Sequence, residues 1–467
     1  MSTSSGNLNS FDAIRIIVTN MFGAGILTLS NSFELAGYIG GTLLLFISCL
    51  LTFTTGYFLY IATDSYETVP VNSSEEESPI KKETTYGDLL GRIKIVSKAL
   101  NLINALICYA STLAYFIFIV EYIHTFFLPH AEGNQYFDSK KGGYLRPLIS
   151  AIMGILFFLV SILIRSVKKL SKICYATLVG VFCVFVMNLS LGFFAVNSSL
   201  SISAFGKNRF AEAIPAFVFA TCCQISIVPV FTKLKNKSKR NAIKILAFSS
   251  LIAFVVYFIS GFFGYYVIRE LGNKDFLEIM FDKQSYYLKS MTDYSGGIYS
   301  TAISVSIIFI FGLFGSYSCQ NFMGRDNLME LINGSTHTTM PIRVILSFVH
   351  NTCLAIIAAY NVPAGFVISL IGSFCMPIVA FLIPSYLYFE ENYVNKYYHN
   401  LIVPSIVFLI GILIFGYSST ECILNFRASR VTLDSTGNIT ELFSNSSKLF
   451  NTTQISNMTV TGATLNP

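Results

Sequence analysis

Long apolar runs separated by short polar segments set the pattern of this sequence. A helix needs about 20 apolar residues to cross the hydrocarbon core of a bilayer. A β-barrel would instead show weak alternation of apolar and polar residues in segments of about ten. The pattern predicts an all-α membrane protein with eleven spans, at residues 11–31, 36–62, 96–127, 146–164, 173–196, 210–231, 242–268, 297–322, 342–360, 364–389 and 401–418.

The composition agrees with this pattern. Hydrophobic residues make up 53% of the 467 residues, charged residues 12%, and the mean hydropathy is +0.62. A soluble fold of this length could not bury so much apolar surface. The start, MSTSSGNLNSFDAIR, lacks the basic flank and cleavage site of a removable signal peptide, so we expect the first span to be retained. We therefore expect one helical membrane domain over residues 11–418.

Basic residues and glycosylation motifs predict the orientation. The short loops 165–172 and 233–240 carry four and five basic residues and no acidic residue, which marks the cytoplasmic side. With an odd number of spans, the N-terminus, residues 1–10, then lies in the cytoplasm and the tail, 419–467, in the lumen or outside. Four sequons in the tail agree, at Asn438, Asn445, Asn451 and Asn457. Sequons on segments predicted to be cytoplasmic, at Asn72, Asn236 and Asn333, give the basic loops more weight.

Polar connections and cysteines narrow the organisation further. The loop 63–94 contains NSSEEESP and is expected to be a solvated connector, with a regulatory or sorting segment as the alternative. The Ser-, Thr- and Asn-rich tail is expected to be disordered. The ten cysteines show no metal-ligand spacing, so neither zinc nor a disulfide framework is expected. The net charge of +6 is spread over loops and does not indicate a nucleic-acid surface.

Two glycines interrupt the first span within TNMFGAGILTLS, residues 19–30. Gly23 and Gly25 lie where a membrane helix should be most regular, and glycine unwinds easily and admits a ligand close to the backbone. Backbone groups freed in a bilayer must be satisfied by protein, water or a bound solute. The stretch is therefore a candidate solute site. The alternative is that the glycines only let two membrane helices touch.

A second interruption is predicted in the sixth span, within ATCCQISIVP at residues 220–229. Pro229 lacks a backbone N–H and clashes with the preceding turn, which favours a local break. The spacing indicates two halves of five helices and one additional span. Interrupted helices at corresponding places in two halves are typical of inverted-repeat transporters with a midplane site.

The motifs together resemble a known family. NMFGAGILTLSNSFELAGYIGG resembles the first-helix signature of the amino acid/auxin permease family, in particular its sodium-coupled neutral amino acid transporter branch. Further similar segments follow in the expected order, namely TYGDLLG at 85–91, ISIVPVFTKLKNKSKRN at 225–241, YFISGFFGYYV at 257–267 and LIGSFCMPIVAFLIPSYLYF at 370–389. The resemblance implies a leucine-transporter-like fold of 5+5 helices plus an eleventh, and secondary active transport of amino acids.

The resemblance also implies where a substrate binds. The backbone amides of Phe22, Gly23, Ala24 and Gly25 would hold the carboxylate, because open N–H groups carry partial positive charge. The amino group would meet carbonyls and polar side chains of the sixth span, from Ala220 to Gln224. Gln224 stands where many relatives have a histidine, and a polar residue satisfied between helices is its alternative interpretation. Gly25→Val is expected to abolish substrate binding and to leave expression largely intact.

A coupling cation is implied at the first and eighth spans. Asn20 matches an asparagine that contributes to cation binding in the sodium-coupled branch, with interhelical packing as the alternative. Ser316 and Ser318 lie where that branch places a hydroxyl ligand for Na⁺, although such hydroxyls often bond their own backbone. The segment SYSCQNFMGRD departs from the family pattern and keeps only Arg325. A proton is therefore the alternative coupling ion.

These observations predict a symporter that moves amino acids by alternating access. Neither break contains Asp or Glu, which favours neutral substrates. An amino-acid-sensing receptor that uses the same pocket is the alternative function. No HExxH, GxSxG or paired intramembrane carboxylate indicates an enzyme. We expect a monomer in the plasma membrane or in a lysosomal or vacuolar membrane, with Na⁺ or H⁺ as coupling ion and no other cofactor.

Overall fold

The computed structural model describes residues 8–23, 25–68, 85–90, 94–131, 144–164, 167–196, 203–206, 210–268, 295–336, 338–360, 362 and 364–436. Over these ranges the chain forms helices, and an isolated parallel bridge joins Leu8 to Leu234. The four predicted glycosylation sites and Ala24 lie outside the described residues.

The helices follow the predicted apolar runs closely. Fourteen α-helices are described: α1 Ser10–Met21, α2 Gly25–Ala36, α3 Tyr38–Thr68, α4 Lys94–Ala131, α5 Leu145–Leu163, α6 Val167–Val196, α7 Phe210–Thr221, α8 Gln224–Thr232, α9 Lys239–Ile268, α12 Ser295–Asn333, α13 Met340–Ala359, α14 Ala364–Phe374, α15 Ile383–Val394 and α16 Ile402–Thr436. Short turns of helix lie at Gly87–Leu90, Ile378–Leu382 and Tyr398–Leu401, and the second of these is a π-helix.

Ten helical segments within the described residues are long and apolar enough to cross a membrane, and one of them, Phe210–Thr232, consists of the interrupted pair α7 and α8. The first predicted span is not among the ten; it consists of α1 and α2, each of 12 residues. Twelve helical residues measure about 18 Å, which is shorter than the hydrocarbon core, so the two halves must cross together. The predicted interruption of the first span is confirmed, and the chain is a multi-pass membrane protein.

Several polar segments differ from the sequence-based expectation. Helix α16 continues to Thr436, well beyond the apolar run that ends at residue 418, because extending an existing helix adds one hydrogen bond for each residue fixed. The end of the expected solvated connector, residues 85–90, is buried. Tyr86 is 1% exposed, and its hydroxyl donates to the carbonyl of Val379 in the π-helix at 2.9 Å. In a π-helix the backbone hydrogen bonds run from residue i to i+5, which changes the pairing of the carbonyls. The Val379 carbonyl that Tyr86 contacts lies in this segment.

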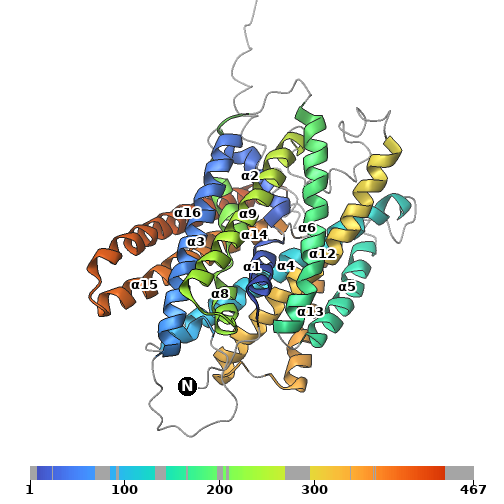
Figure 1. Cartoon of the computed structure of the whole chain (residues 1–467). Coiled ribbons are helices and arrows are strands. Elements are labelled where there is room, and N and C mark those ends of the chain that lie inside the picture. Colours follow the sequence, from blue (N-terminus) through green and yellow to red (C-terminus); the bar gives the residue numbers. More distant parts are fainter. Residues whose placement is uncertain are drawn as a thin grey trace, which may run out of the picture.

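The helices pack in two groups (Figure 1). In one group α1, α2, α3, α7, α8 and α9 contact one another, and in the other α12 packs along α4 and α5 packs along α13. Helix α6 contacts both α12 and α9 and so links the two groups. Helices α15 and α16 extend to one side of the molecule. The two interrupted helices, α1–α2 and α7–α8, belong to the same group and meet in its interior.

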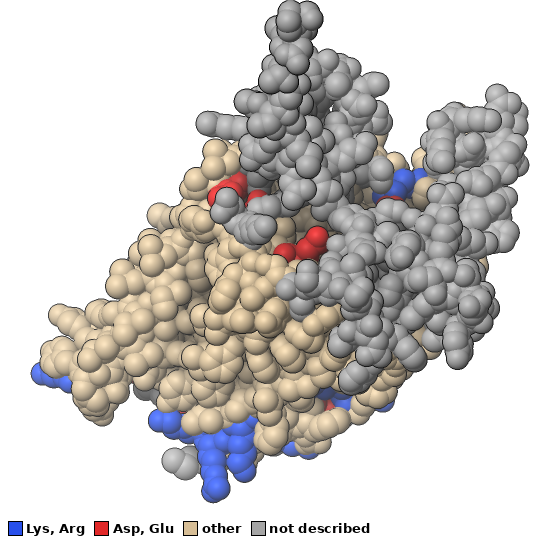
Figure 2. All heavy atoms as spheres, turned by 90° about the horizontal axis from the view of Figure 1, so that it is seen from above, with Lys and Arg blue, Asp and Glu red and all other residues tan. Residues whose placement is uncertain are grey.

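The outer surface matches a lipid environment. Large apolar side chains are exposed along several long helices, for example Ile155 on α5, Leu251 on α9 and Leu413 on α16. Seen from above, the described surface carries few charged side chains, and basic residues gather at its margins (Figure 2). One end of the helix bundle, which we term the basic end, carries three lysines of the loop between α8 and α9 and the first two residues of α9, namely Lys233, Lys235, Lys237, Lys239 and Arg240.

Candidate functional site

The first break lies between α1 and α2. Helix α1 ends at Met21, and Phe22 leaves the helix with an extended conformation (φ −75°, ψ 121°) after its N–H makes a last helical bond to the Val18 carbonyl at 2.8 Å. Helix α2 then begins at Gly25. Phe22 is 2% exposed, so the freed backbone groups lie in the protein interior. The amino end of α2 offers N–H groups with partial positive charge that suit a carboxylate.

The second break lies between α7 and α8, at Cys222 and Cys223. The sequence placed the cause of this break at Pro229, but Pro229 lies inside α8. The break is instead held by Gln224, whose side-chain oxygen accepts the Cys223 N–H at 2.9 Å and the Cys222 thiol at 3.0 Å. The Gln224 amide nitrogen donates to the hydroxyl of Thr55 on α3 at 2.9 Å. These side-chain bonds satisfy the Cys223 N–H and the Cys222 thiol, which lie in the break itself.

These bonds give Gln224 a structural role at the break. It is completely buried, and both ends of its amide have partners in the described structure. This agrees with the interpretation of Gln224 as a polar residue satisfied between helices. Its direct contact with a substrate stays a prediction.

The two breaks touch each other through Gly25. A Cβ atom added to Gly25 would lie 2.8 Å from the Cβ of Ala220 and 2.9 Å from its Cα. A Cβ added to Gly23 would lie 2.6 Å from the hydroxyl oxygen of Tyr115 on α4. Both glycines therefore allow close packing, and both adjoin the interruption of the helix. The structure thus shows the helix contact that the packing interpretation expects, and the solute site stays a prediction.

One hydroxyl group contacts backbone carbonyls at the C-terminal ends of both α1 and α7. Tyr257 on α9 is completely buried, and its hydroxyl lies within hydrogen-bonding distance of the Met21 carbonyl and, at 2.9 Å, of the Ala220 carbonyl. Its ring packs edge-on against Phe22, with 5.3 Å between ring centroids. Sequence reasoning missed Tyr257. It begins the segment YFISGFFGYYV, but nothing in that segment indicates which carbonyls it meets.

Two further hydroxyls meet open carbonyls at the breaks. Ser316 on α12 donates to the Phe22 carbonyl at 2.7 Å, and Thr52 on α3 donates to the Thr221 carbonyl at 3.3 Å. The predicted partner residue Ser318 instead donates to the carbonyl of Phe314, four residues back on its own helix, at 2.6 Å. Of the two predicted serines, the structure therefore brings only Ser316 to the break.

Asn20 lies in the last turn of α1, directly before the first break, and its side-chain oxygen has no hydrogen-bond partner among the described residues. It is 5% exposed, and its amide nitrogen contacts the sulfur of Met323 on α12 at 3.4 Å. Its side-chain oxygen is buried and accepts no hydrogen bond from the described residues. Leaving a buried acceptor unpaired costs about 1–3 kcal/mol. An amide oxygen in this state is a suitable ligand for a hard cation such as Na⁺.

Two pockets lie toward the basic end, away from the direct contact between the breaks. One is lined by Thr85, Tyr86, Met323, Asp326 and Asn327, together with residues of α8. Met323 is also the contact of Asn20. This pocket therefore lies between the neighbourhood of Asn20 and the loop residues 85–90, and its lining includes both polar and apolar side chains.

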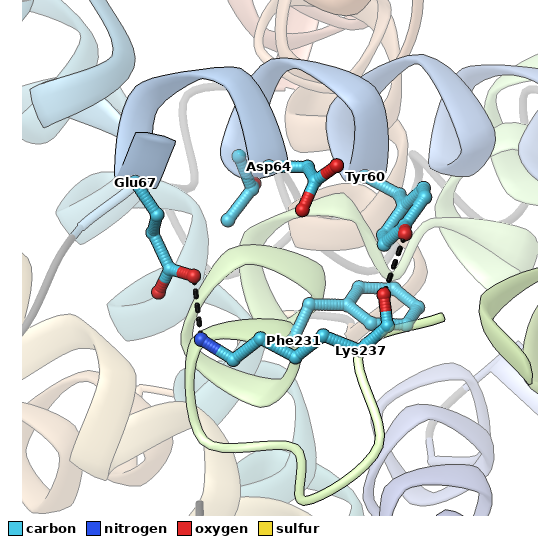
Figure 3. Close-up of a pocket in the computed structure, with 6 residues that line it drawn as sticks. Tyr60, Asp64, Glu67, Phe231 and Lys237 are labelled. Carbon is cyan, nitrogen blue, oxygen red and sulfur yellow. Dashed lines mark hydrogen bonds and ion pairs between the residues drawn. The ribbon is translucent and has the colours of Figure 1, made fainter. Parts of the chain in front are cut away.

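The other pocket lies beyond the far end of α8 (Figure 3). In it Tyr60 and Glu67 of α3 face the loop after α8. The Tyr60 hydroxyl donates to the Lys237 carbonyl at 2.7 Å, and the Lys237 ammonium pairs with Glu67 at 2.5 Å. These contacts tie α3 to the α8–α9 loop. The pocket is separated from the second break by the length of α8 and is not a candidate for the solute site.

Comparisons with known proteins identify relatives of the sequence. A family model described as transmembrane amino acid transporter protein matches residues 6–424. The sodium-coupled neutral amino acid symporter 2 of Danio rerio is 19% identical over 184 residues, which make up 39% of this chain and 34% of the relative. The match thus spans about a third of that relative's length.

Solved structures of similar fold cover nearly the whole chain. Mhp1, a nucleobase-cation-symport-1 family transporter in a closed conformation with bromovinylhydantoin bound, has a TM-score of 0.51 at 13% identity and covers 95% of this chain and 97% of its own. A manganese transporter of Eremococcus coleocola has a TM-score of 0.47 at 12% identity, covering 88% and 94%. The likeness to Mhp1 confirms the predicted leucine-transporter-like fold.

Proposed function

The chain belongs to the family of transmembrane amino acid transporter proteins, and from this premise we propose that it moves neutral amino acids across a membrane by alternating access, coupled to Na⁺. Membership confirms the family predicted from the motifs and agrees with the expectation that the protein is not an enzyme. The observation that carries the proposal is the contact between the two broken helices at Gly25 and Ala220, where open amides and open carbonyls come together.

The chemistry of the breaks suits a zwitterion. The first amides of α2 favour a carboxylate, and the carbonyls of Met21 and Ala220, at the ends of α1 and α7, favour an ammonium group. The stretches 19–30 and 220–229 contain no Asp or Glu. A cationic side chain on the substrate would therefore lack a carboxylate partner at the breaks, and this supports neutral amino acids.

Two side chains support a cation beside the substrate. The unpaired oxygen of Asn20 and the hydroxyl of Ser316 adjoin the first break from two different helices. Neither group titrates near neutral pH, so both favour a metal cation over a proton. The Danio rerio relative is named a sodium-coupled symporter, which agrees with Na⁺ as the coupling ion.

The basic end is proposed to face the cytosol. Three lysines of the α8–α9 loop, the two basic residues that begin α9 and the start of α1 lie there, as the positive-inside rule expects. The pocket lined by Tyr86, Met323 and Asn327 would then connect the cation position with the cytosol. The buried segment 85–90 covers this route and would have to move when the site opens.

Uptake into reconstituted vesicles tests the proposed function. A panel of radiolabelled amino acids is offered with Na⁺ and pH gradients imposed separately. We expect concentrative uptake of neutral amino acids that follows the Na⁺ gradient. Uptake that follows only the pH gradient would replace Na⁺ by a proton. Binding of an amino acid without flux under any gradient would show a sensing receptor and would refute transport.

Ser316 and Ser318 of α12 offer a matched pair of variants. Ser316→Ala removes the hydrogen bond to the Phe22 carbonyl and is expected to raise the half-saturating Na⁺ concentration about fivefold, since such a bond contributes about 1 kcal/mol. Ser318→Ala removes only a bond within its own helix and is expected to change that value less than about twofold. Uptake measured against Na⁺ concentration distinguishes them. Equal effects of both substitutions would contradict a cation role for Ser316.

A further inference from the structure

The hydroxyl of Tyr257 faces more acceptors than it can satisfy. It lies against the carbonyl oxygens of Met21 and Ala220, but a phenol has one proton and can donate to one carbonyl at a time. Met21 is the last residue of α1, and Ala220 is the second-last residue of α7. Carbonyls at these positions have no partner within their own helix. The hydroxyl therefore bridges two carbonyls at the point where two helices end.

The surroundings of this bridge exclude water. Met21 is 4% exposed, and Ala220 and Tyr257 are completely buried. The carboxyl ends of two helices meet here, and each carries partial negative charge. Because neither lipid nor water reaches the buried carbonyls, a donor from the protein or from a bound solute must serve them. In this arrangement the Tyr257 hydroxyl is that donor.

A substrate ammonium group would form stronger hydrogen bonds with the Met21 and Ala220 carbonyls than the Tyr257 hydroxyl does. It carries a positive charge and three N–H donors, so it can donate to both oxygens at once. We propose that Tyr257 is a positioning residue that holds α1 and α7 together when no substrate is bound, and that its hydroxyl gives up the two carbonyls when the substrate ammonium arrives. This inference rests on the proposed transport of amino acids.

The proposal has a consequence for the transport cycle. In net uptake the unloaded protein must return through a closed state, in which water cannot reach the two carbonyls. In exchange of one substrate molecule for another, the protein crosses loaded in both directions, and the ammonium group serves the carbonyls. Tyr257 is therefore needed for the return of the unloaded protein and is dispensable for exchange.

Tyr257→Phe tests this division. The substitution keeps the ring that packs on Phe22 and removes only the hydroxyl. Net uptake into unloaded vesicles is compared with exchange into vesicles preloaded with the same unlabelled amino acid, and both are normalised to folded protein. We expect net uptake to fall about tenfold, the effect of leaving a buried carbonyl unpaired, and exchange to stay within about twofold of wild type.

Tyr317→Phe provides the matched control. Tyr317 on α12 is also completely buried, and its hydroxyl donates to Asn351 at 2.8 Å and lies 3.0 Å from the hydroxyl of Ser161, away from both breaks. Loss of the Tyr317 hydroxyl is expected to leave the ratio of net uptake to exchange unchanged. An equal fall of net uptake and exchange in Tyr257→Phe, or no change in either, overturns the inference.

Thermal unfolding gives a second measurement that does not depend on transport rates. Without substrate, Tyr257→Phe is expected to have a lower Tm than wild type, and a saturating neutral amino acid is expected to remove most of that difference. A difference in Tm that persists in the presence of substrate would show a purely structural hydroxyl and overturn the inference. If the wild-type protein shows neither uptake nor exchange of any amino acid, the proposed function itself fails.

Discussion

Gly25→Val is expected to abolish transport and to lower the yield of folded protein several-fold. Even the Cβ of the new side chain would lie 2.8 Å from the Cβ of Ala220 and 2.9 Å from its Cα, so α2 and α7 must move apart. Overpacking of a buried contact costs about 1–3 kcal/mol. Fluorescence-detected gel filtration measures the folded yield, and vesicle uptake measures transport.

This expectation differs from the one drawn from the sequence, which assigned Gly25 to the ligand and left expression intact. The structure shows that the added side chain meets protein backbone before it meets any solute. Gly416→Ala on α16 is the control, because a Cβ added there meets no atom within 4 Å. Alanine in place of glycine in an open helical position stabilises by up to about 1 kcal/mol. A full yield of folded Gly25→Val with wild-type uptake would contradict the contact between the two breaks.

Asn20→Leu is expected to weaken the Na⁺ dependence of transport while leaving the protein as stable as wild type or more so. Leucine has the same branched skeleton of four side-chain heavy atoms as asparagine, with bulkier methyl groups at its ends, and carries no polar atom. The Asn20 oxygen is buried and unpaired in the described structure, so its removal relieves a cost of about 1–3 kcal/mol. The half-saturating Na⁺ concentration, measured by uptake, is expected to rise at least about tenfold, because one ligand of a small site is lost.

Stability and Na⁺ dependence, measured together, distinguish a cation ligand at Asn20 from an asparagine that only packs between helices. An asparagine that only packs between helices would lose its contact with Met323 on substitution and leave the Na⁺ dependence unchanged. Asn351→Leu is the control, because the Asn351 amide accepts from Tyr317 and donates to the Ser347 carbonyl at 2.7 Å. Removing such a satisfied group is expected to lower the Tm and to leave the Na⁺ dependence intact. A half-saturating Na⁺ concentration that Asn20→Leu leaves unchanged would refute the cation role.

Much of the architecture could be predicted from local properties of the chain. Hydropathy located the spans because each apolar run is long enough on its own to cross a bilayer. Gly23 and Gly25 located the first break because glycine is the residue that a helix interior tolerates least after proline. The second break was expected in the correct stretch but attributed to Pro229, which α8 contains without interruption.

The error at Pro229 has an identifiable physical reason. Pro229 lies in the second turn of α8, and the carbonyl that its N–H would have reached belongs to Ile225, in the first turn. A helix that begins at Gln224 therefore loses one hydrogen bond at Pro229 but continues. The break lies before Gln224, at Cys222 and Cys223, where the Gln224 side chain bonds both residues, and no sequence rule for prolines indicates these bonds.

The sequence by itself determined that this protein crosses the membrane many times, that its first and sixth spans are interrupted, and which family it belongs to. Those properties depend on hydropathy, glycine and motifs, which are readable within about 20 neighbouring residues. Only the tertiary structure decided that Gly25 packs on Ala220, that Tyr257 bridges two helix ends and that the Asn20 oxygen has no partner among the described residues. These contacts join residues that are far apart in the chain, and their geometry follows from how the helices pack.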